Sequence, residues 1–148
     1  MERITSFSVD HTKLKKGVYI SRVDYDLTTY DIRMTEPNVD TPLDPRAAHT
    51  IEHLGATLLR NGKYKDSIIY FGPMGCMTGF YLITKDLDFE TVKVLVKDTF
   101  LEIASWDKDI PGAKEEECGN YSYMDLNKAK ESSLFFVNSE WEHTYHFL

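Results

Sequence analysis

The chain has 148 residues, of which 42% are hydrophobic and 28% are charged, a composition typical of a soluble globular protein. We expect one domain over residues 1–148, because a chain of this length can bury about two-thirds of its surface and needs no disulfide to be stable. The formal net charge of −7 argues against nucleic-acid binding, which requires a basic surface, and favours a small-molecule partner.

The sequence carries no sign of a membrane segment or of export. No apolar run approaches the roughly 20 residues that span a bilayer, and residues 1–3 lead into no apolar signal segment. We therefore expect a cytoplasmic protein that makes no membrane contact. In such a chain the two cysteines, Cys76 and Cys118, favour thiol chemistry or metal ligation over a structural disulfide.

The first segments predict an arm followed by a β-hairpin. Residues 6–16 are polar and show little periodicity, so we expect an arm in which His11 is solvated. Residues 18–24 and 29–34 are rich in β-branched and aromatic side chains and are separated by a short polar link, which predicts two paired strands. In the second strand Arg33 falls on the more polar face, so this stretch alone predicts a solvent-exposed arginine.

A helix is expected next, between Asp44-Pro45 and Asn61-Gly62. Asp44 can accept a hydrogen bond as the N-cap residue, and Pro45 suits the first helical position. Asn61-Gly62 is expected to supply the left-handed residue that stops the helix.

The predicted helix carries the motif His49-Thr50-Ile51-Glu52-His53. At about 100° per residue, His53 and Glu52 lie about 40° and 60° to either side of His49, so the three side chains point the same way. Such a helix can hold a divalent metal between its histidines, with Glu52 beside it as an unligated base. Two histidines at this spacing are about as often a surface pair without a metal, so a third ligand is needed.

The segment after this helix predicts a second hairpin with a thiol at its turn. Residues 67–71 and 77–84 are expected to be strands, with a tight turn at Gly72-Pro73-Met74-Gly75. Cys76 follows this turn, where the backbone can approach a ligand closely. A free cysteine is more often a small buried hydrophobic residue, but the surrounding glycines remove the side chains that would bury Cys76.

Two helices and an acidic loop are expected in the last third of the chain. Apolar residues recur every three or four positions in 89–106, which predicts an amphipathic helix, and a last helix is expected over 126–136. Between them, Cys118 follows three glutamates, and a thiol in this acidic setting is a poor nucleophile but an effective metal ligand. His143 and His146 in the aromatic tail form a second histidine pair with nothing to anchor it.

Together these elements predict an α+β fold, in which a mainly antiparallel sheet packs against helices and the metal site lies on the H-x-x-E-H helix. His49, His53 and Cys118 would give three protein ligands, the number that catalytic tetrahedral sites use before water or substrate takes the fourth position. A metal with Glu52 and Cys76 beside it suits proton transfer next to a carbonyl.

Four groups of residues occur in a characteristic order. They are Tyr30-Asp31-Ile32-Arg33 with Glu36-Pro37-Asn38, then His49-Thr50-Ile51-Glu52-His53-Leu54, then Gly72-Pro73-Met74-Gly75-Cys76-Met77-Thr78-Gly79-Phe80-Tyr81-Leu82, then Cys118-Gly119 followed by Asp125-Leu126. In these groups the chain resembles the S-ribosylhomocysteine lyase family, usually called LuxS, over nearly its whole length. No single group of residues is specific for this family, but the four groups together are.

The resemblance implies that His49, His53 and Cys118 hold one divalent metal, Fe2+ in the family and often replaced by Zn2+ or Co2+. It implies that Glu52 and Cys76 are paired acid–base groups. The implied reaction opens the ribose ring of S-ribosylhomocysteine, moves the carbonyl from C1 to C2 to C3 through two enediolates, and then releases homocysteine by β-elimination. The other product is 4,5-dihydroxy-2,3-pentanedione, the precursor of autoinducer-2.

Three further residues, Ser6, His11 and Arg33, match family positions that line the substrate site. That site forms between two subunits in the family, so the resemblance also implies a homodimer with the site at its interface.

The chain departs from the family at three positions. Tyr70 stands where the family typically has an aspartate, Gly72 replaces a common serine, and Met124 replaces a histidine of many members. The change at Tyr70 removes a carboxylate near the pocket and bears on how the substrate is held, so a different thioether-linked pentose is an alternative substrate.

Two other functions also fit the motifs. A metallopeptidase with the inverted motif would take a carboxylate among Glu115, Glu116 and Glu117 as third ligand and would leave Cys76 without a role. A non-catalytic metal-binding or dimerisation module would need neither Cys76 nor Glu52.

Overall fold

Four strands form one antiparallel sheet in the order β1-β2-β4-β3. In the computed structural model, which describes residues 1–141, they are β1 (Gly17–Asp24), β2 (Leu27–Arg33), β3 (Ile68–Pro73) and β4 (Gly79–Lys85). The hairpins β1-β2 and β3-β4 join through antiparallel pairing of β2 with β4. Both predicted hairpins are confirmed, but the second turn begins later than predicted because β3 continues to Pro73. His143 and His146 lie outside the described residues.

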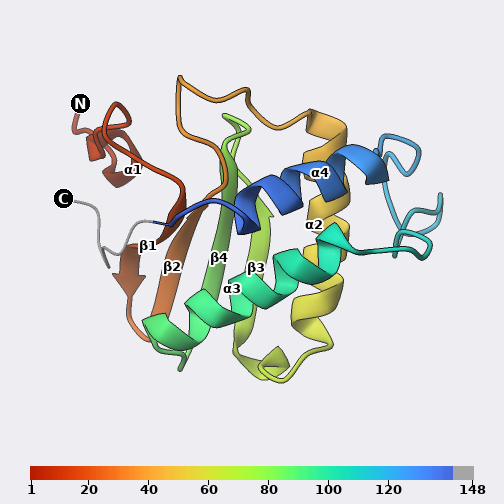
Figure 1. Ribbon diagram of the computed structural model, residues 1–148. Helices are drawn as coiled ribbons and strands as arrows, with labels where there is room; N and C mark the ends of the chain where they lie inside the picture. Colours follow the sequence, from red (N-terminus) through yellow and green to blue (C-terminus); the bar gives the residue numbers. More distant parts are fainter. Residues whose placement is uncertain (142–148) are drawn as a thin grey trace.

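Helices cover one face of this sheet (Figure 1). They are α2 (Pro45–Arg60), α3 (Phe89–Ala104) and α4 (Leu126–Val137), and a short 3-10 helix η1 (Lys65–Ser67) precedes β3. The four-residue helix α1 (Thr5–Ser8) lies apart from them in the N-terminal arm (Figure 1). Figure 1 shows α3 and α4 crossing in front of the strands and α2 running beside them next to β3. The predicted α+β single domain is confirmed. Among the described helices, none is long and apolar enough to cross a membrane.

Four aromatic rings join the sheet to its helices. Phe80 of β4 stacks on Phe71 of β3 with ring centroids 4.8 Å apart, and Phe100 of α3 lies 6.4 and 6.5 Å from these two rings. Phe136 of α4 packs edge-on against Phe100 at 5.2 Å. Burying one such side chain contributes on the order of 1.5–3 kcal/mol, so this cluster fixes α3 and α4 on the sheet.

The helix α2 begins as predicted and ends differently. The Asp44 side chain accepts a hydrogen bond from the Arg46 backbone N–H at 2.8 Å, and Pro45 occupies the first turn. The predicted left-handed stop at Asn61-Gly62 is wrong, since Asn61 has φ −109° and Gly62 does not have a positive φ. The backbone N–H and the side-chain amide of Asn61 instead both donate to the Thr57 carbonyl, at 3.1 and 2.7 Å, and this satisfies an orphan carbonyl without a left-handed residue.

The sheet face opposite α3 and α4, here called the outer face, carries polar groups. Tyr19, Asp31, Tyr81 and Gly72 lie opposite one another across the four strands, so this row points away from the helices. Asp31 is nevertheless 1% exposed. The outer face is therefore partly covered, and it offers polar side chains that the hydrophobic core does not use.

Gly79 lets β2 and β4 approach closely, and we expect Gly79→Ala to destabilise the protein. A Cβ at this position would lie 2.0 Å from the Ile32 carbonyl oxygen, a backbone atom that cannot swing aside. The expected loss is about 1–3 kcal/mol of unfolding free energy, measured by urea titration. The matched control is Gly75→Ala in the turn that precedes β4, where a Cβ would meet no atom within 4 Å. Equal losses in the two variants would contradict this account.

Candidate active site

Three side chains that could bind a metal converge at α2. His49 and His53 come from neighbouring turns of this helix, and Cys118 comes from the loop 105–125 between α3 and α4. One ligand atom from each residue lies within 4.8 Å of the others. The Cys118 sulfur is 3.5 Å from His49 Nε2, and all three side chains are half-buried. These residues are called the metal group below.

Backbone carbonyls of the same loop orient both imidazoles. His49 Nδ1 lies 2.6 Å from the Tyr123 carbonyl oxygen, and His53 Nδ1 lies 2.8 Å from that of Pro111. A carbonyl oxygen can only accept, so each Nδ1 carries the hydrogen, and the lone pair of the neutral ring is on Nε2. Such outer hydrogen bonds fix the ring orientation of histidine ligands. Two imidazole nitrogens and one thiolate suit Fe2+, Zn2+ or Co2+.

The loop that supplies Cys118 is held to α2 by further contacts. The Asp125 backbone N–H donates to Thr50 Oγ1 of α2 at 2.9 Å. Within the loop itself, the Cys118 N–H donates to the Lys114 carbonyl at 3.0 Å. Gly112 has φ +71°, and a Cβ there would lie 3.0 Å from His53 Nδ1. A glycine at this position therefore lets the loop pass close to the imidazole.

Glu52 lies beside the metal group, as the helical spacing predicted. It lines an open cavity of about 380 Å³ together with His53, Gly112 and Glu117. The cavity reaches from α2 to the loop, so the Glu52 carboxylate can face a molecule that approaches the metal group from this side.

Cys76 belongs to a different hydrogen-bonded group. Its side chain is exposed, and its sulfur lies 3.0 Å from Thr78 Oγ1. Thr78 Oγ1 also accepts a hydrogen bond from Arg33 Nη1 at 2.8 Å. Because the hydroxyl oxygen already accepts from a guanidinium, its own hydrogen is available to the Cys76 sulfur. The expectation that a free cysteine is usually buried does not hold here.

The prediction that Arg33 is solvent-exposed is wrong. Arg33 is 2% exposed because it pairs with Asp31, two residues earlier on the same face of β2. Arg33 Nε donates to Asp31 Oδ1 at 3.1 Å, and Nη2 donates to Oδ2. A buried guanidinium needs such a partner, since an unpaired buried charge is very costly. Asp31 and Thr78 were not predicted as part of the site. The i, i+2 spacing of opposite charges on one strand is a signal for Asp31, whereas Thr78 has no such signal.

The N-terminal arm brings the remaining predicted residues to the outer face. His11 is half-buried rather than solvated, and its Nδ1 lies 2.8 Å from the Val9 carbonyl. Burial raises the pKa of Asp31, and Arg33 and the nearby His11 partly oppose this effect. Ser6 is half-buried and lines a cavity of about 250 Å³ with Tyr70 and Tyr81. Ser6, His11, Arg33 and Cys76 are called the sheet-face group below.

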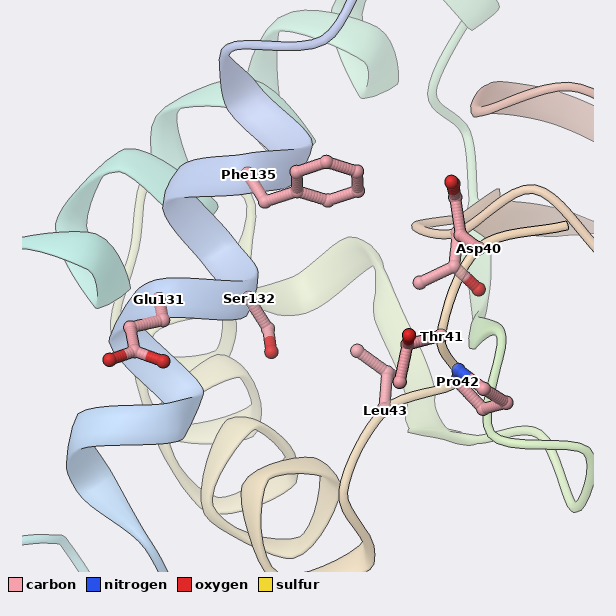
Figure 2. Close-up of a pocket in the computed structure, with 8 residues that line it drawn as sticks. Asp40, Thr41, Pro42, Leu43, Glu131, Ser132 and Phe135 are labelled. Atoms are coloured by element: carbon pink, nitrogen blue, oxygen red, sulfur yellow. The ribbon is translucent and has the colours of Figure 1, made fainter.

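A separate cavity of about 370 Å³ lies between the chain that follows β2 and the helix α4 (Figure 2). Figure 2 shows Phe135 extending from α4 and Asp40 on the opposite side of the opening. The cavity is lined by Thr35, Asp40, Thr41, Pro42, Leu43, Glu131, Ser132 and Phe135. None of the predicted site residues contributes to it.

The chain is similar to known proteins over most of its length. A family model described as S-ribosylhomocysteinase (LuxS) matches residues 4–146. The chain belongs to the LuxS family. A relative named S-ribosylhomocysteine lyase from Desulfotalea psychrophila is 51% identical over 90% of this chain and 87% of its own. Relatives of the same name from Borreliella burgdorferi and Phocaeicola vulgatus are 49% and 46% identical, over 91% and 97% of this chain and 90% and 92% of theirs.

The LuxS resemblance predicted from the motifs is thus confirmed, and so is membership of a family of lyase enzymes. Neither a metallopeptidase nor a passive metal-binding module is indicated by these relatives.

Asp44 caps the helix that carries two of the metal-group residues, and its charge predicts a pH dependence. The hydrogen bond from the Arg46 N–H, with help from the Lys128 ammonium group, lowers the pKa of the Asp44 carboxyl below its usual 3.8. A depressed pKa in the folded state means that this carboxylate stabilises the fold above the unfolded pKa and that the contribution is lost as pH falls through the folded pKa.

We therefore expect Asp44→Ala to lower the thermal midpoint at neutral pH by a few degrees, as loss of an N-cap does. The difference from wild type should shrink as pH falls below about 4, measured by circular dichroism. Asp44→Asn is the matched control, because it keeps a capping oxygen without the charge and should lose less. A difference between Asp44→Ala and wild type that stays constant with pH would count against the charge effect.

Proposed function

We propose that this protein is a homodimeric, metal-dependent S-ribosylhomocysteine lyase of the cytoplasm. It converts S-ribosylhomocysteine to homocysteine and 4,5-dihydroxy-2,3-pentanedione, the autoinducer-2 precursor. Family membership supports the substrate and the reaction class. The observation that carries the proposal is the metal group, in which two imidazoles are turned by loop carbonyls toward a nearby thiol. A reducing cytoplasm suits the two free cysteines that this function uses.

In this proposal His49, His53 and Cys118 hold Fe2+, with Zn2+ or Co2+ as substitutes. Their three donor atoms leave room for a water or substrate oxygen. When bound, a divalent metal polarises a carbonyl oxygen and thereby makes the neighbouring C–H bonds more acidic.

Glu52 and Cys76 move the protons. Shifting a carbonyl from C1 to C2 and then to C3 requires proton removal from one carbon and proton delivery to the next, so two groups that exchange protons are needed. The Glu52 side chain lines the cavity beside His53. The Cys76 sulfur lies 3.0 Å from the Thr78 hydroxyl oxygen, so the hydroxyl can hydrogen-bond with it. The C3 ketone makes the C4 proton acidic, so the thioether carbon–sulfur bond breaks by β-elimination and no nucleophile is required.

Ser6, His11 and Arg33 hold the substrate in this proposal. Arg33 is a suitable fixed donor because Asp31 and Thr78 lock its guanidinium in place. A locked donor positions a substrate hydroxyl or carboxylate without a further loss of side-chain entropy.

A homodimer would complete the site at its interface. The metal group lies on α2 and the loop 105–125, whereas the sheet-face group lies on the outer face and the arm. Large apolar side chains are exposed in this second region: Ile4 and Phe7 in the arm at 57% and 71%, and Tyr70 on β3 at 48%. Exposed apolar side chains next to polar groups suit a subunit interface.

The lyase function predicts release of a thiol from S-ribosylhomocysteine. Wild-type protein loaded with Fe2+ or Co2+ should release homocysteine, followed continuously with a thiol reagent. Cys76→Ala and Glu52→Gln should each lower kcat by about 10²–10⁴-fold, the usual contribution of an acid–base group. A peptidase or a passive metal-binding module would release no thiol in any of the three forms, and that result would overturn the proposal.

The two cysteines should differ in metal retention. Cys118→Ala should lose most of its metal after dialysis, because only two of the three protein ligands remain. Cys76→Ala keeps all three and should retain one full equivalent of metal per subunit. Metal content is measured by atomic emission on purified protein. Equal metal loss in both variants would show that the roles of the two thiols are assigned wrongly.

A further inference from the structure

An aromatic side chain anchors the turn that carries Cys118 to α2. The Arg46 guanidinium lies over the Tyr123 ring, with its Cζ atom 5.1 Å from the ring centroid. The same ring packs beside the His49 imidazole, with the two centroids 6.5 Å apart. Arg46 and His49 are three residues apart in the first turns of α2, so they are neighbours on the helix surface. Tyr123 is therefore held against α2 by two of its side chains.

The backbone of Tyr123 acts on two members of the metal group. Its carbonyl oxygen accepts the hydrogen bond from His49 Nδ1 at 2.6 Å. Its N–H donates to the Asn120 carbonyl at 3.1 Å, and the Asn120 N–H in turn donates to the Cys118 sulfur at 3.5 Å. A displacement of Tyr123 would therefore disturb the orientation of one imidazole and the position of the thiol at the same time.

The residues that follow Tyr123 have contacts of their own with α2. The Asp125 N–H donates to Thr50 Oγ1 at 2.9 Å, and Lys128 Nζ lies 3.3 Å from Asp44 Oδ2. These contacts hold the start of α4, whereas Tyr123 holds the turn 118–123 that precedes it.

We propose that Arg46 is a positioning residue for the metal group. Its guanidinium keeps the Tyr123 ring on the first turns of α2, and the ring keeps the Tyr123 carbonyl on His49. A carbonyl belongs to every residue, so what makes this one useful is the contact that fixes the place of its segment. This inference rests on the proposed metal-dependent function.

The expected effect is modest and has a diagnostic sign. Loss of an outer partner of a histidine ligand typically weakens metal binding about 10–100-fold, but Arg46 is exposed and Tyr123 is 38% exposed, so their contact belongs below this range. Removing a positive charge near a bound cation would by itself tighten metal binding. Faster metal release without Arg46 therefore has the opposite sign to a simple charge effect.

The test follows metal release from Zn2+-loaded protein into an excess of the chelating dye pyridylazoresorcinol, measured by absorbance. Arg46→Gln, which keeps much of the side-chain length without the charge, should release metal about twofold to fivefold faster than wild type. Arg46→Lys keeps a cation over the ring and should restore most of the wild-type retention. Arg60→Gln is the matched control, because Arg60 is an exposed arginine at the other end of α2 that donates to the Ile69 carbonyl, and this variant should release metal at the wild-type rate.

A double-mutant cycle tests the contact itself. Tyr123→Ala keeps the backbone carbonyl but removes the ring, so it should release metal faster than wild type, whereas Tyr123→Phe keeps the ring and should not. Arg46→Gln in the Tyr123→Ala background should add little, because the ring that Arg46 holds is already gone. Additive effects of the two changes would overturn the inference.

The outcomes separate this inference from the proposed function. Metal release from Arg46→Gln at the wild-type rate, or more slowly, would overturn the positioning role of Arg46 and leave the lyase function intact. Wild-type protein that bound no metal and released no thiol would overturn the proposed function itself.

Discussion

The hydrogen bonds from two imidazoles to two loop carbonyls determine how this site is built. The Pro111 and Tyr123 carbonyls lie on either side of Cys118 in the loop 105–125, and each fixes one histidine of α2. The same short stretch therefore supplies the thiol and sets which nitrogen of each ring carries the lone pair. Any change in the path of the loop would alter all three donor atoms together. The cap at Asp44 matters to the site because it begins the helix that carries both histidines. The aromatic cluster around Phe100 matters because it holds α3 and α4, the two helices that this loop connects.

A buried ion pair organises the residues around Cys76, the second acid–base group of the proposed reaction. Arg33 is held by Asp31 on one side and reaches Thr78 on the other, and Thr78 meets Cys76. The thiol at this exposed turn thereby gains a polar neighbour, Thr78, that is held in place by an arginine of the other hairpin. Burying such a pair carries a desolvation cost that a hydrophobic pair would avoid, so a role in positioning the turn explains its presence better than stability does.

Much of this arrangement could be predicted from the sequence, and the remainder depended on contacts between distant residues. The common face of His49, Glu52 and His53 follows from helical geometry alone, and the start of α2 follows from Asp44-Pro45. The carbonyls that orient the imidazoles could not be predicted, because every residue has a carbonyl and these lie 58 and 74 residues away in sequence. Arg33 was misjudged because the alternation of a strand gives its face but does not show whether another segment covers that face. The end of α2 was misjudged because an asparagine can satisfy a helix end in either of two conformations.

The close passage of the loop 105–125 at Gly112 also makes the metal group sensitive to a residue that has no donor atom. Gly112 has φ +71°, and a Cβ there would lie 3.0 Å from His53 Nδ1. A side chain at this position would displace either the imidazole or the loop, and with the loop the Pro111 carbonyl that holds His53. Metal affinity can therefore be lost through a substitution that leaves all three donor residues unchanged.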